Sequence, residues 1–390
     1  MTPSARVQAG IEVLDLVIAA ARSNGASADR IVAEWFRTRR FAGSGDRRAV
    51  RELVYGAIRA CGEVPVSGRM AMLLLAKVDP GLAGLFDGSH HGPAPIASGE
   101  RVAGAGTAPA WLVKVLEASG IADDEAAAMM GRAPLDIRRN RLKATLDLPL
   151  PGAETQAPDA LRFPAGTPVE QWEAFQTGAI EVQDTGSQLA CLAVGARPGE
   201  TVVDLCAGAG GKTLALAAAM DNRGRLIACD TDRGRLSRLA PRAAKAGAAI
   251  VEERLLDPSR EAAALADLAG QADAVLVDAP CSGSGTWRRN PEARWRLTPR
   301  ELERLGMLQA RLLDLAAGLV RPGGRLVFVT CSLLDAEGAD QAEGFLTRHP
   351  KWRTQTPAIG AGRARGAGLR LTPWHDQSDG FFIARFDSVC

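Results

Sequence analysis

Two cysteines occupy matching places in two separate apolar runs of this chain. Cys281 follows the run in "ADAVLVDAPCSGSG", and Cys331 follows the run in "RLVFVTCSLLDAEG". A thiolate is a strong nucleophile, so two thiols at the ends of strand-like segments indicate a shared reactive site. The alternative for a single cysteine is the role of a small buried hydrophobe. We assign that role to Cys61, Cys191, Cys229 and Cys390.

A glycine-rich loop lies in "VVDLCAGAGGKT", between an apolar run and a helical segment. Gly208, Gly210 and Gly211 permit a tight turn and the close approach of a ligand to the backbone. The end of the loop, "GKT", matches a phosphate-binding loop, but Cys206 stands where that loop needs its first glycine. The glycine spacing of a dinucleotide-binding dehydrogenase is absent.

The acids around this loop favour a ligand without phosphate. Asp204 directly precedes the loop, where a carboxylate would repel a triphosphate. Asp230 ends the next apolar run, where dinucleotide folds carry a ribose-binding carboxylate. A ribose, a positive centre and no phosphate describe S-adenosylmethionine, which we therefore predict as the cofactor. A phosphate-binding nucleotidase and a plain structural turn are the alternatives.

The thiols suit an acceptor that is not reactive enough by itself, such as carbon 5 of a cytosine. Thiolate addition at carbon 6 turns the ring into an enamine, whose carbon 5 then takes a methyl group. Since a free cysteine has a pKa near ~8.5, the site must lower that pKa or deprotonate the thiol. Asp278, three residues before Cys281, is placed to donate a proton to ring nitrogen 3. A base must later remove the hydrogen at carbon 5 before the thiol leaves.

The elements that must position these side chains alternate from residue 200 onward. Apolar runs are separated by helical segments, which predicts an α/β fold with a mostly parallel sheet covered on both faces. The runs are "TVVDLCA", "RLIACD", "AAIVEE", "ADAVLVDAP" and "RLVFVTCS". Parallel sheets bind ligands outside the carboxyl ends of their strands. The acids and both thiols are therefore expected to gather at one edge.

The first 182 residues are organised differently. Residues 5–75 place apolar side chains at three- and four-residue steps, which predicts helices. Residues 80–109 are rich in Gly and Pro and predict a long loop or linker. We predict a helical domain over residues 1–105, a helical linker with a small α+β segment over 106–182, and a methyltransferase domain over 183–390.

The composition is that of an ordinary globular protein. Of the 390 residues 46% are hydrophobic and 24% are charged, and no apolar run is long enough to span a membrane. The seven cysteines are widely spaced and lack C-x-x-C pairs, which argues against a disulfide framework or a zinc site. The first residues lack the pattern of a secretory signal. We expect a reduced, cytoplasmic, monomeric protein without a metal or a membrane partner.

Taken together, these motifs resemble the RsmB/Nop/Sun family of RNA cytosine-5 methyltransferases. The matching segments are "VQDTGSQLA", "DLCAGAGGKT", "CD" at 229–230, "DAPCSGSGTWRRNPEARW", "TCSLLDAEG" and "DGFFIARF". The resemblance implies a Rossmann-like methyltransferase domain with a seven-stranded sheet and a preceding NusB-like helical RNA-binding domain. It implies an RNA substrate, with 16S ribosomal RNA favoured over transfer RNA. The alternative is a non-catalytic RNA-binding assembly factor that keeps the fold.

The resemblance also assigns roles to residues. Cys331 corresponds to the family's nucleophile, and Cys281 to the second cysteine, which assists breakdown of the covalent adduct; Asp278 would support the ring. The residues implied in binding S-adenosylmethionine are Asp204, Cys206, Ala207, Gly208, Ala209, Gly210, Gly211, Lys212, Asp230, Arg235, Asp257 and Asp278.

Three locally basic segments, residues 30–59, 132–143 and 285–300, are candidates for RNA contact, because clustered Arg side chains bind phosphates. In the first segment, Trp35, Phe36 and Phe41 are interleaved with Arg and could stack on bases. The alternative is a set of solvated helix faces with the aromatic rings turned inward. The individual RNA-binding candidates are Arg139, Asn140, Lys143, Arg288, Arg289 and Arg294.

Overall fold

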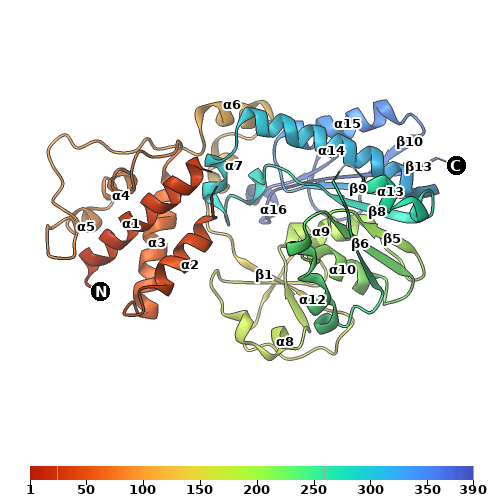
Figure 1. Ribbon diagram of the computed structural model, residues 1–390, viewed down its shortest axis with the longest axis horizontal. Coiled ribbons are helices and arrows are strands. Elements are labelled where there is room, and N and C mark those ends of the chain that lie inside the picture. The colour runs from red at the N-terminus through yellow and green to blue at the C-terminus, as the bar shows by residue number, and fades with distance from the viewer. Residues whose placement is uncertain (24, 259, 390) are drawn as a thin grey trace. The chain divides into compact units, whose positions relative to one another are not determined.

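The computed structural model describes residues 1–23, 25–258 and 260–389, so Cys390 lies outside the described residues. The chain divides into two compact units (Figure 1). The helical unit comprises residues 1–131 and 286–299, and the sheet unit comprises residues 132–285 and 300–390. Across the described ranges, no helix is long and apolar enough to cross a membrane. No cluster of metal-ligating side chains is found among those same residues.

The helical unit begins with the helices that the periodicity of residues 5–75 predicts. Thr2 caps the first helix by accepting a hydrogen bond from the N–H of Ala5, and Pro3 takes the first helical position. The apolar faces enclose one core that includes Val13 and Val54. The helices are α1 (Pro3–Arg22), α2 (Ala28–Arg37), α3 (Ser44–Ala60) and α4 (Gly68–Ala76). The expected helical start is confirmed.

The Gly/Pro-rich segment 80–109 contains the short helix α5 (Pro80–Ala83) and is otherwise a long irregular loop, as expected. Arg69 ties it to α4 through an ion pair with Glu100 at 2.5 Å and a hydrogen bond to the carbonyl of Ala94 at 3.0 Å. The compact unit continues beyond this loop through α6 (Ala110–Ala118) and α7 (Asp123–Ala128). The division into three domains stays a prediction.

The segment 286–299 is separated from residues 1–131 in the sequence but belongs to the helical unit. Its short helix η4 (Pro291–Trp295) places Trp295 in the helical core. The buried Arg294 donates to the carbonyls of Ile58 and Cys61, each at 2.7 Å. Glu292 accepts a hydrogen bond from the N–H of Ala28 at 2.9 Å, near the start of α2. The core of the helical unit is thus completed by residues from much later in the chain.

The sheet unit opens with a small antiparallel sheet of order β2-β3-β1-β4. The buried Asp136 on β1 accepts two hydrogen bonds from Arg162 on β3, both at 2.7 Å. It also accepts one from the hydroxyl of Thr185, which begins the helix α9. The elements are β1 (Leu135–Arg139), β2 (Ala153–Glu154), β3 (Ala160–Phe163), η1 (Val169–Gln171), α8 (Glu173–Gln176), β4 (Ile180–Val182) and α9 (Thr185–Val194).

The main sheet has the order β11-β12-β13-β9-β8-β5-β6-β7, with β10 paired to β13. Its parallel strands are the five predicted ones: β5 (Thr201–Asp204), β6 (Arg225–Asp230), β7 (Val251–Leu255), β8 (Ala272–Asp278) and β9 (Val320–Thr330). The antiparallel strands are β10 (Trp352–Gln355), β11 (Arg363–Arg365), β12 (Gly368–Leu371) and β13 (Phe381–Ser388). The α/β class is confirmed. The sheet has nine strands rather than seven, because short β10 and β11 extend its antiparallel side.

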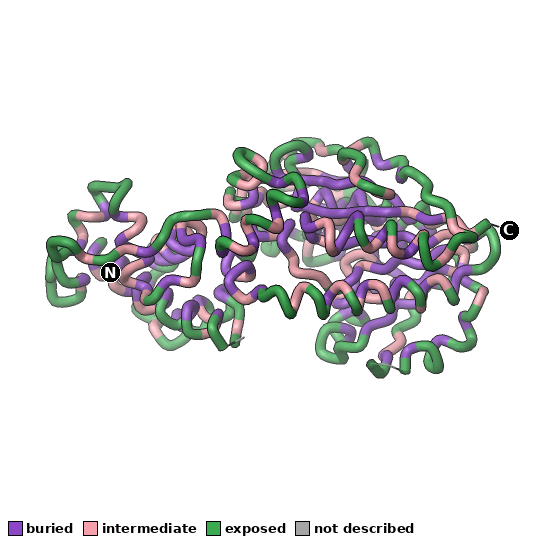
Figure 2. Tube along the Cα trace, turned by 90° about the horizontal axis from the view of Figure 1, so that it is seen from above, coloured by how far each residue is buried: buried purple, intermediate pink, exposed green. Residues whose placement is uncertain are grey.

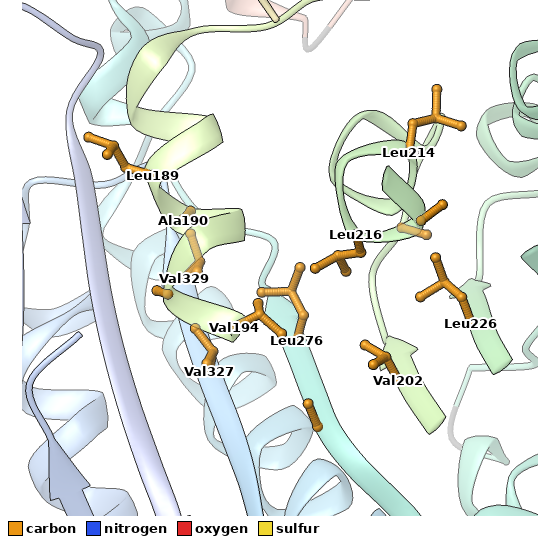
Figure 3. Close-up of a cluster of buried hydrophobic side chains, with 14 of the residues drawn as sticks. Leu189, Ala190, Val194, Val202, Leu214, Leu216, Leu226, Leu276, Val327 and Val329 are labelled. Carbon is orange, nitrogen blue, oxygen red and sulfur yellow. The ribbon is translucent and has the colours of Figure 1, made fainter. Parts of the chain in front are cut away.

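Successive residues of a strand point to opposite faces of the sheet. Both faces of this sheet are apolar and are covered by helices. Val202 belongs to one apolar cluster with residues of α9, whereas Val203 belongs to another with residues of α14. Figure 3 shows the first cluster, with Leu189 and Val194 of α9 against the strands. The central strands β5, β6, β8 and β13 are mostly buried, and Figure 2 shows long buried stretches of the chain in purple. The remaining helices are α10 (Gly211–Ala219), α11 (Arg233–Leu236), α12 (Leu239–Ala246), α13 (Glu261–Ala264), η2 (Ala266–Leu268), η3 (Ser284–Thr286), α14 (Pro299–Leu319), η5 (Asp335–Glu337), α15 (Ala339–Arg348) and α16 (Pro373–Asp376).

Candidate active site

The glycine-rich loop joins β5 to α10 at the carboxyl edge of the sheet. The N–H of Ala207 bonds to the carbonyl of Cys229 at 2.8 Å. Gly208 and Gly210 have φ angles of +57° and +87°, which residues with a Cβ rarely adopt. A Cβ at Gly208 would also lie 2.4 Å from Nη2 of Arg235. These glycines are required by the backbone itself, and the loop shape follows from them.

The same loop leaves room for a ligand at its last position. A Cβ added at Gly211 would meet no atom within 4 Å, in contrast to its two neighbouring loop glycines. Gly211 is also the first residue of α10, where unpaired backbone N–H groups carry partial positive charge. Open space beside the backbone suits a ligand that approaches the loop closely.

Asp204, the last residue of β5, is fully buried beneath this loop. Its Oδ2 accepts a hydrogen bond from the hydroxyl of Thr213 at 2.7 Å, whereas its Oδ1 has no partner. Burial raises the pKa of Asp204 to about 7. An orphaned buried carboxylate oxygen is a site for a cationic group, so the residues here fit the positively charged end of S-adenosylmethionine.

Lys212 forms an ion pair with Asp278, with 2.7 Å between Nζ and Oδ2. Burial opposes the charged form of Lys212, but the neighbouring Asp278 carboxylate outweighs it, so the pKa of Lys212 lies above its usual value. In a phosphate-binding loop this lysine would reach the phosphates. Here its charge is already matched by an acid of the same site, which disfavours the nucleotidase alternative.

Asp230, at the end of β6, holds the glycine loop through its two carboxylate oxygens. Oδ2 accepts from the N–H of Gly208 and Oδ1 from the N–H of Asp232, each at 2.7 Å. Asp257 is exposed and follows β7, the strand beyond β6. Of the predicted acids, Asp204, Asp230 and Asp278 therefore end three adjacent strands, and Asp257 stands further out along the same edge.

The thiols of Cys281 and Cys331 lie next to each other. β8 and β9 are neighbouring parallel strands, so the loops that follow them lie side by side. Sγ of Cys281 and Sγ of Cys331 are 3.4 Å apart, and both residues are partly exposed. The hydrogen bond to Cys331 and burial both raise the pKa of the Cys281 thiol well above its usual value. The two thiols, predicted to lie at one edge of the sheet, are thus neighbours in the structure.

A polar network that the sequence analysis missed joins the two cysteine loops. It consists of the hydroxyls that follow the cysteines, a buried glutamate and a glutamine: Ser282, Ser284, Ser332, Gln309 and Glu337. The signal available in the sequence was the repeated Cys-Ser pair in "PCSGSG" and "TCSLLDAEG". Two backbone hydrogen bonds also connect these loops. The N–H of Gly285 donates to the carbonyl of Cys331, and the N–H of Gly380 donates to the carbonyl of Gly285. The motif "DGFFIARF" thus supports the thiol loops through its glycine.

The RNA-binding candidates divide into exposed and buried residues. Arg139 is exposed, and Lys143 and Arg289 are partly exposed. Asn140 is buried and donates to the carbonyls of Gly178 and Ala246, both at 2.8 Å. Arg288 is 7% exposed, and the buried Arg294 is engaged with backbone carbonyls, as described above. Asn140 and Arg294 thus both donate to backbone carbonyls of the protein itself, and their contact with RNA stays a prediction.

The aromatic residues of segment 30–59 are also mostly turned inward. Trp35 and Phe36 belong to the helical core. Phe41 is 74% exposed. The guanidinium of Arg39 stacks over the Trp35 ring at 3.9 Å from its centroid. Of the three rings proposed to stack on bases, Phe41 is the one that is accessible.

A mostly parallel sheet, with an acid-flanked glycine loop and a pair of contacting thiols at its carboxyl edge, defines a Rossmann-like domain of the methyltransferase class. The chain belongs to the 16S rRNA methyltransferase RsmB/F family, which it matches over residues 191–387.

Individual proteins support this assignment. The chain is 34% identical over 295 residues to a probable ribosomal RNA small subunit methyltransferase B of Synechocystis sp., covering 71% of this chain and 66% of the relative. It is 31% identical to a ribosomal RNA small subunit methyltransferase B of Pectobacterium atrosepticum, covering 71% of this chain and 65% of the relative. The chain thus spans about two thirds of the length of these relatives. Among solved structures, the crystal structure of PH0851 is similar over 100% of this chain and 99% of its own, with a TM-score of 0.75 and 25% identity.

Proposed function

We propose that this protein methylates carbon 5 of a cytosine in 16S ribosomal RNA, using S-adenosylmethionine and a covalent bond between Cys331 and the base. The observation that carries the proposal is the pair of thiols 3.4 Å apart at the sheet edge that also holds Asp204, Lys212 and Asp278. The family's RNA substrates support the choice of RNA. The protein would act as a cytoplasmic monomer without a metal.

The proposed cofactor supplies an electrophilic methyl group when bound. On the protein side, the orphaned Oδ1 of Asp204 would hold a positive group of the cofactor. The open face of Gly211 would admit the cofactor to the backbone. Asp230 would keep the loop in shape through Gly208 while its remaining lone pairs accept from ribose hydroxyls. Arg235 and Asp257 are the proposed outer contacts.

The thiolate of Cys331 would attack carbon 6 of the cytosine, which makes carbon 5 nucleophilic. Asp278, held in place by Lys212 at 2.7 Å, would face ring nitrogen 3 and carry the proton that balances the ring's new charge. After methylation, a base removes the hydrogen at carbon 5. The electron pair of the broken carbon–hydrogen bond re-forms the double bond between carbons 5 and 6 and expels the sulfur of Cys331.

The raised pKa of Cys281 suits it to the release step rather than to attack. A thiol that keeps its proton is a poor nucleophile but can donate a hydrogen bond to the departing Cys331 thiolate 3.4 Å away. Loss of Cys281 would therefore leave adduct formation intact and slow its breakdown.

A denaturing gel tests the proposal. Wild type, Cys281→Ala, Cys331→Ala and the double variant are incubated with S-adenosylmethionine and unmodified small-subunit ribosomal RNA. We expect a nuclease-sensitive upward shift for Cys281→Ala alone, with Cys229→Ala, a buried cysteine on β6, as the matched control. A shift with Cys331→Ala instead would exchange the two roles. A shift with transfer RNA but not with ribosomal RNA would identify transfer RNA as the substrate. Cofactor binding without methylation of either RNA would favour the assembly-factor alternative.

The exposed basic residues define the proposed RNA contacts. Arg139 and Lys143 lie on the sheet unit, and Arg289 and the Arg residues around Phe41 lie on the helical unit. Their side chains would bind phosphates and so give affinity that falls as salt rises.

A further inference from the structure

The hydroxyl groups that directly follow the two cysteines contact one another. Oγ of Ser282 lies 3.3 Å from Oγ of Ser332, and Oγ of Ser284 lies 3.0 Å from that same atom. Ser284 accepts from the N–H of Leu333 at 2.9 Å, so the bonds cross from the loop after β8 to the loop after β9. The distance between the thiols is therefore set by a network next to them rather than by the strands alone.

Glu337 lies at the centre of this network with a fully buried side chain. Its Oε1 accepts from the N–H of Ser282 at 2.8 Å and from the amide of Gln309 at 3.2 Å, and its Oε2 accepts from the Ser282 hydroxyl. Its backbone carbonyl accepts from the hydroxyl of Thr330 at 3.1 Å. Glu337 thus binds the residue after Cys281 and the residue before Cys331.

A buried carboxylate held by neutral donors is costly, because burial disfavours its charge. The hydrogen bonds alone do not require a carboxylate, because the oxygen of a neutral amide would accept from some of the same donors. What a carboxylate adds beyond hydrogen bonds is a negative charge beside Cys281.

We propose that Glu337 is a positioning residue that clamps the two thiol loops in contact and keeps Cys281 in its protonated form for the release of Cys331. The second half of this proposal rests on the proposed function, whereas the clamp itself does not. The hydrogen bond to Cys331 and burial raise the pKa of Cys281 most, and the charges of Cys331 and of the Glu337 carboxylate raise it further. Lys212 and Asp278, which also belong to the site, are paired with each other.

The clamp is tested by using disulfide formation as a gauge of the distance between the thiols. Diamide takes two electrons and two protons from Cys281 and Cys331, which become a disulfide while the diamide is reduced to its hydrazine. We expect Glu337→Ala to slow this reaction by at least ~10-fold, since misplacement by about 1 Å costs up to ~100-fold in reactions between fixed groups. The matched control is Glu261→Gln, a buried carboxylate of the same unit that is paired with Arg311 at 2.8 Å.

The charge is tested separately with Glu337→Gln in a Cys331→Ser background. We expect alkylation of Cys281 by iodoacetamide to reach its half-maximal rate at lower pH than in the background alone. A role limited to folding would change the melting temperature without moving this pH profile. Should Glu337→Ala fail to fold, Ser282→Ala removes one donor of the clamp and is expected to slow disulfide formation in the same direction.

Equal rates of disulfide formation in all variants would overturn the clamp. An unchanged pH profile would overturn the electrostatic role. Neither experiment needs RNA or cofactor, so a negative result here is distinct from a failure of the proposed methyl transfer.

Discussion

Asp204 should make the protein without cofactor less stable at alkaline pH than at acid pH. Its carboxylate is fully buried with one oxygen unpartnered, and burial raises its pKa to about 7. Because the native state binds this proton more tightly than the unfolded chain, the contribution of Asp204 to stability is greatest below about pH 4. That contribution falls as the pH rises and levels off above about pH 7.

The magnitude follows from the two pKa values. With about 7 in the folded state and ~3.9 in the unfolded chain, ionisation of Asp204 costs roughly 1.5 kcal/mol at pH 5 and roughly 4 kcal/mol at pH 8. Asp204→Asn removes this pH dependence and keeps an acceptor for Thr213, although its amide N–H groups take the position of the unpartnered oxygen. The free energy of unfolding of the variant, relative to that of the wild type, should therefore be roughly 2.5 kcal/mol higher at pH 8 than at pH 5.

Urea unfolding followed by circular dichroism at both pH values measures this difference. Asp136→Asn is the matched control: burial opposes ionisation there too, but the hydrogen bonds from Arg162 prevail and lower the pKa of Asp136. Its variant should be destabilised about equally at both pH values, since both lie above the usual pKa of an aspartate. The reasoning about Asp204 would be refuted if its variant showed no more pH dependence relative to wild type than the control. By calorimetric titration, Asp204→Asn should also bind S-adenosylmethionine more weakly, because it lacks the charge that the cofactor's cation would meet.

Three further changes test other parts of the structure. Lys212→Met leaves Asp278 without its cation and should lower the rate of methyl transfer at saturating RNA by roughly 100-fold, measured with labelled cofactor; an unchanged rate would remove the pair from the chemistry. Gly210→Ala forces a side chain into a left-handed conformation at 2.1 Å from Leu239, and should weaken cofactor binding in a titration without affecting the helical unit. Arg294→Ala removes the guanidinium that binds the Cys61 carbonyl and should increase hydrogen exchange in α3 well beyond that in the main sheet; uniform protection would show that segment 286–299 is dispensable there.

The positions of the acids and thiols could be predicted because they follow from strand periodicity. Four of the five apolar runs end with a candidate site residue or are closely followed by one, and parallel strands bring their carboxyl ends to one edge. That argument places Asp204 and Asp278 near each other and Cys281 near Cys331 without any knowledge of the loops. It cannot supply the contacts between loops, and so Glu337, which is distant in sequence from Ser282, was not found.

The partners of the basic side chains, in contrast, could not be predicted from the sequence. The net charge of a short segment shows that it is basic but not what its side chains bind. A guanidinium donates hydrogen bonds to backbone carbonyls as readily as to phosphates. Arg294, which the sequence predicts as an RNA contact, is buried and donates to backbone carbonyls of the helical unit. Its partners, the carbonyls near the end of α3, have no sequence signature.

Asp230 shows why structural and chemical roles cannot be separated by mutation alone. The sequence predicts a ribose ligand there, and the structure adds a second task, since both carboxylate oxygens already accept backbone N–H groups at 2.7 Å. An ionised carboxylate has lone pairs left for ribose hydroxyls, so the two tasks are compatible. Removing it, however, would release Gly208 as well as the proposed ribose contact, and loss of cofactor affinity would follow from either cause. Asp204 differs in this respect, because its Oδ1 binds nothing in the protein: there the loss of affinity reports on the cofactor directly, which makes Asp204 the more informative acid of the site.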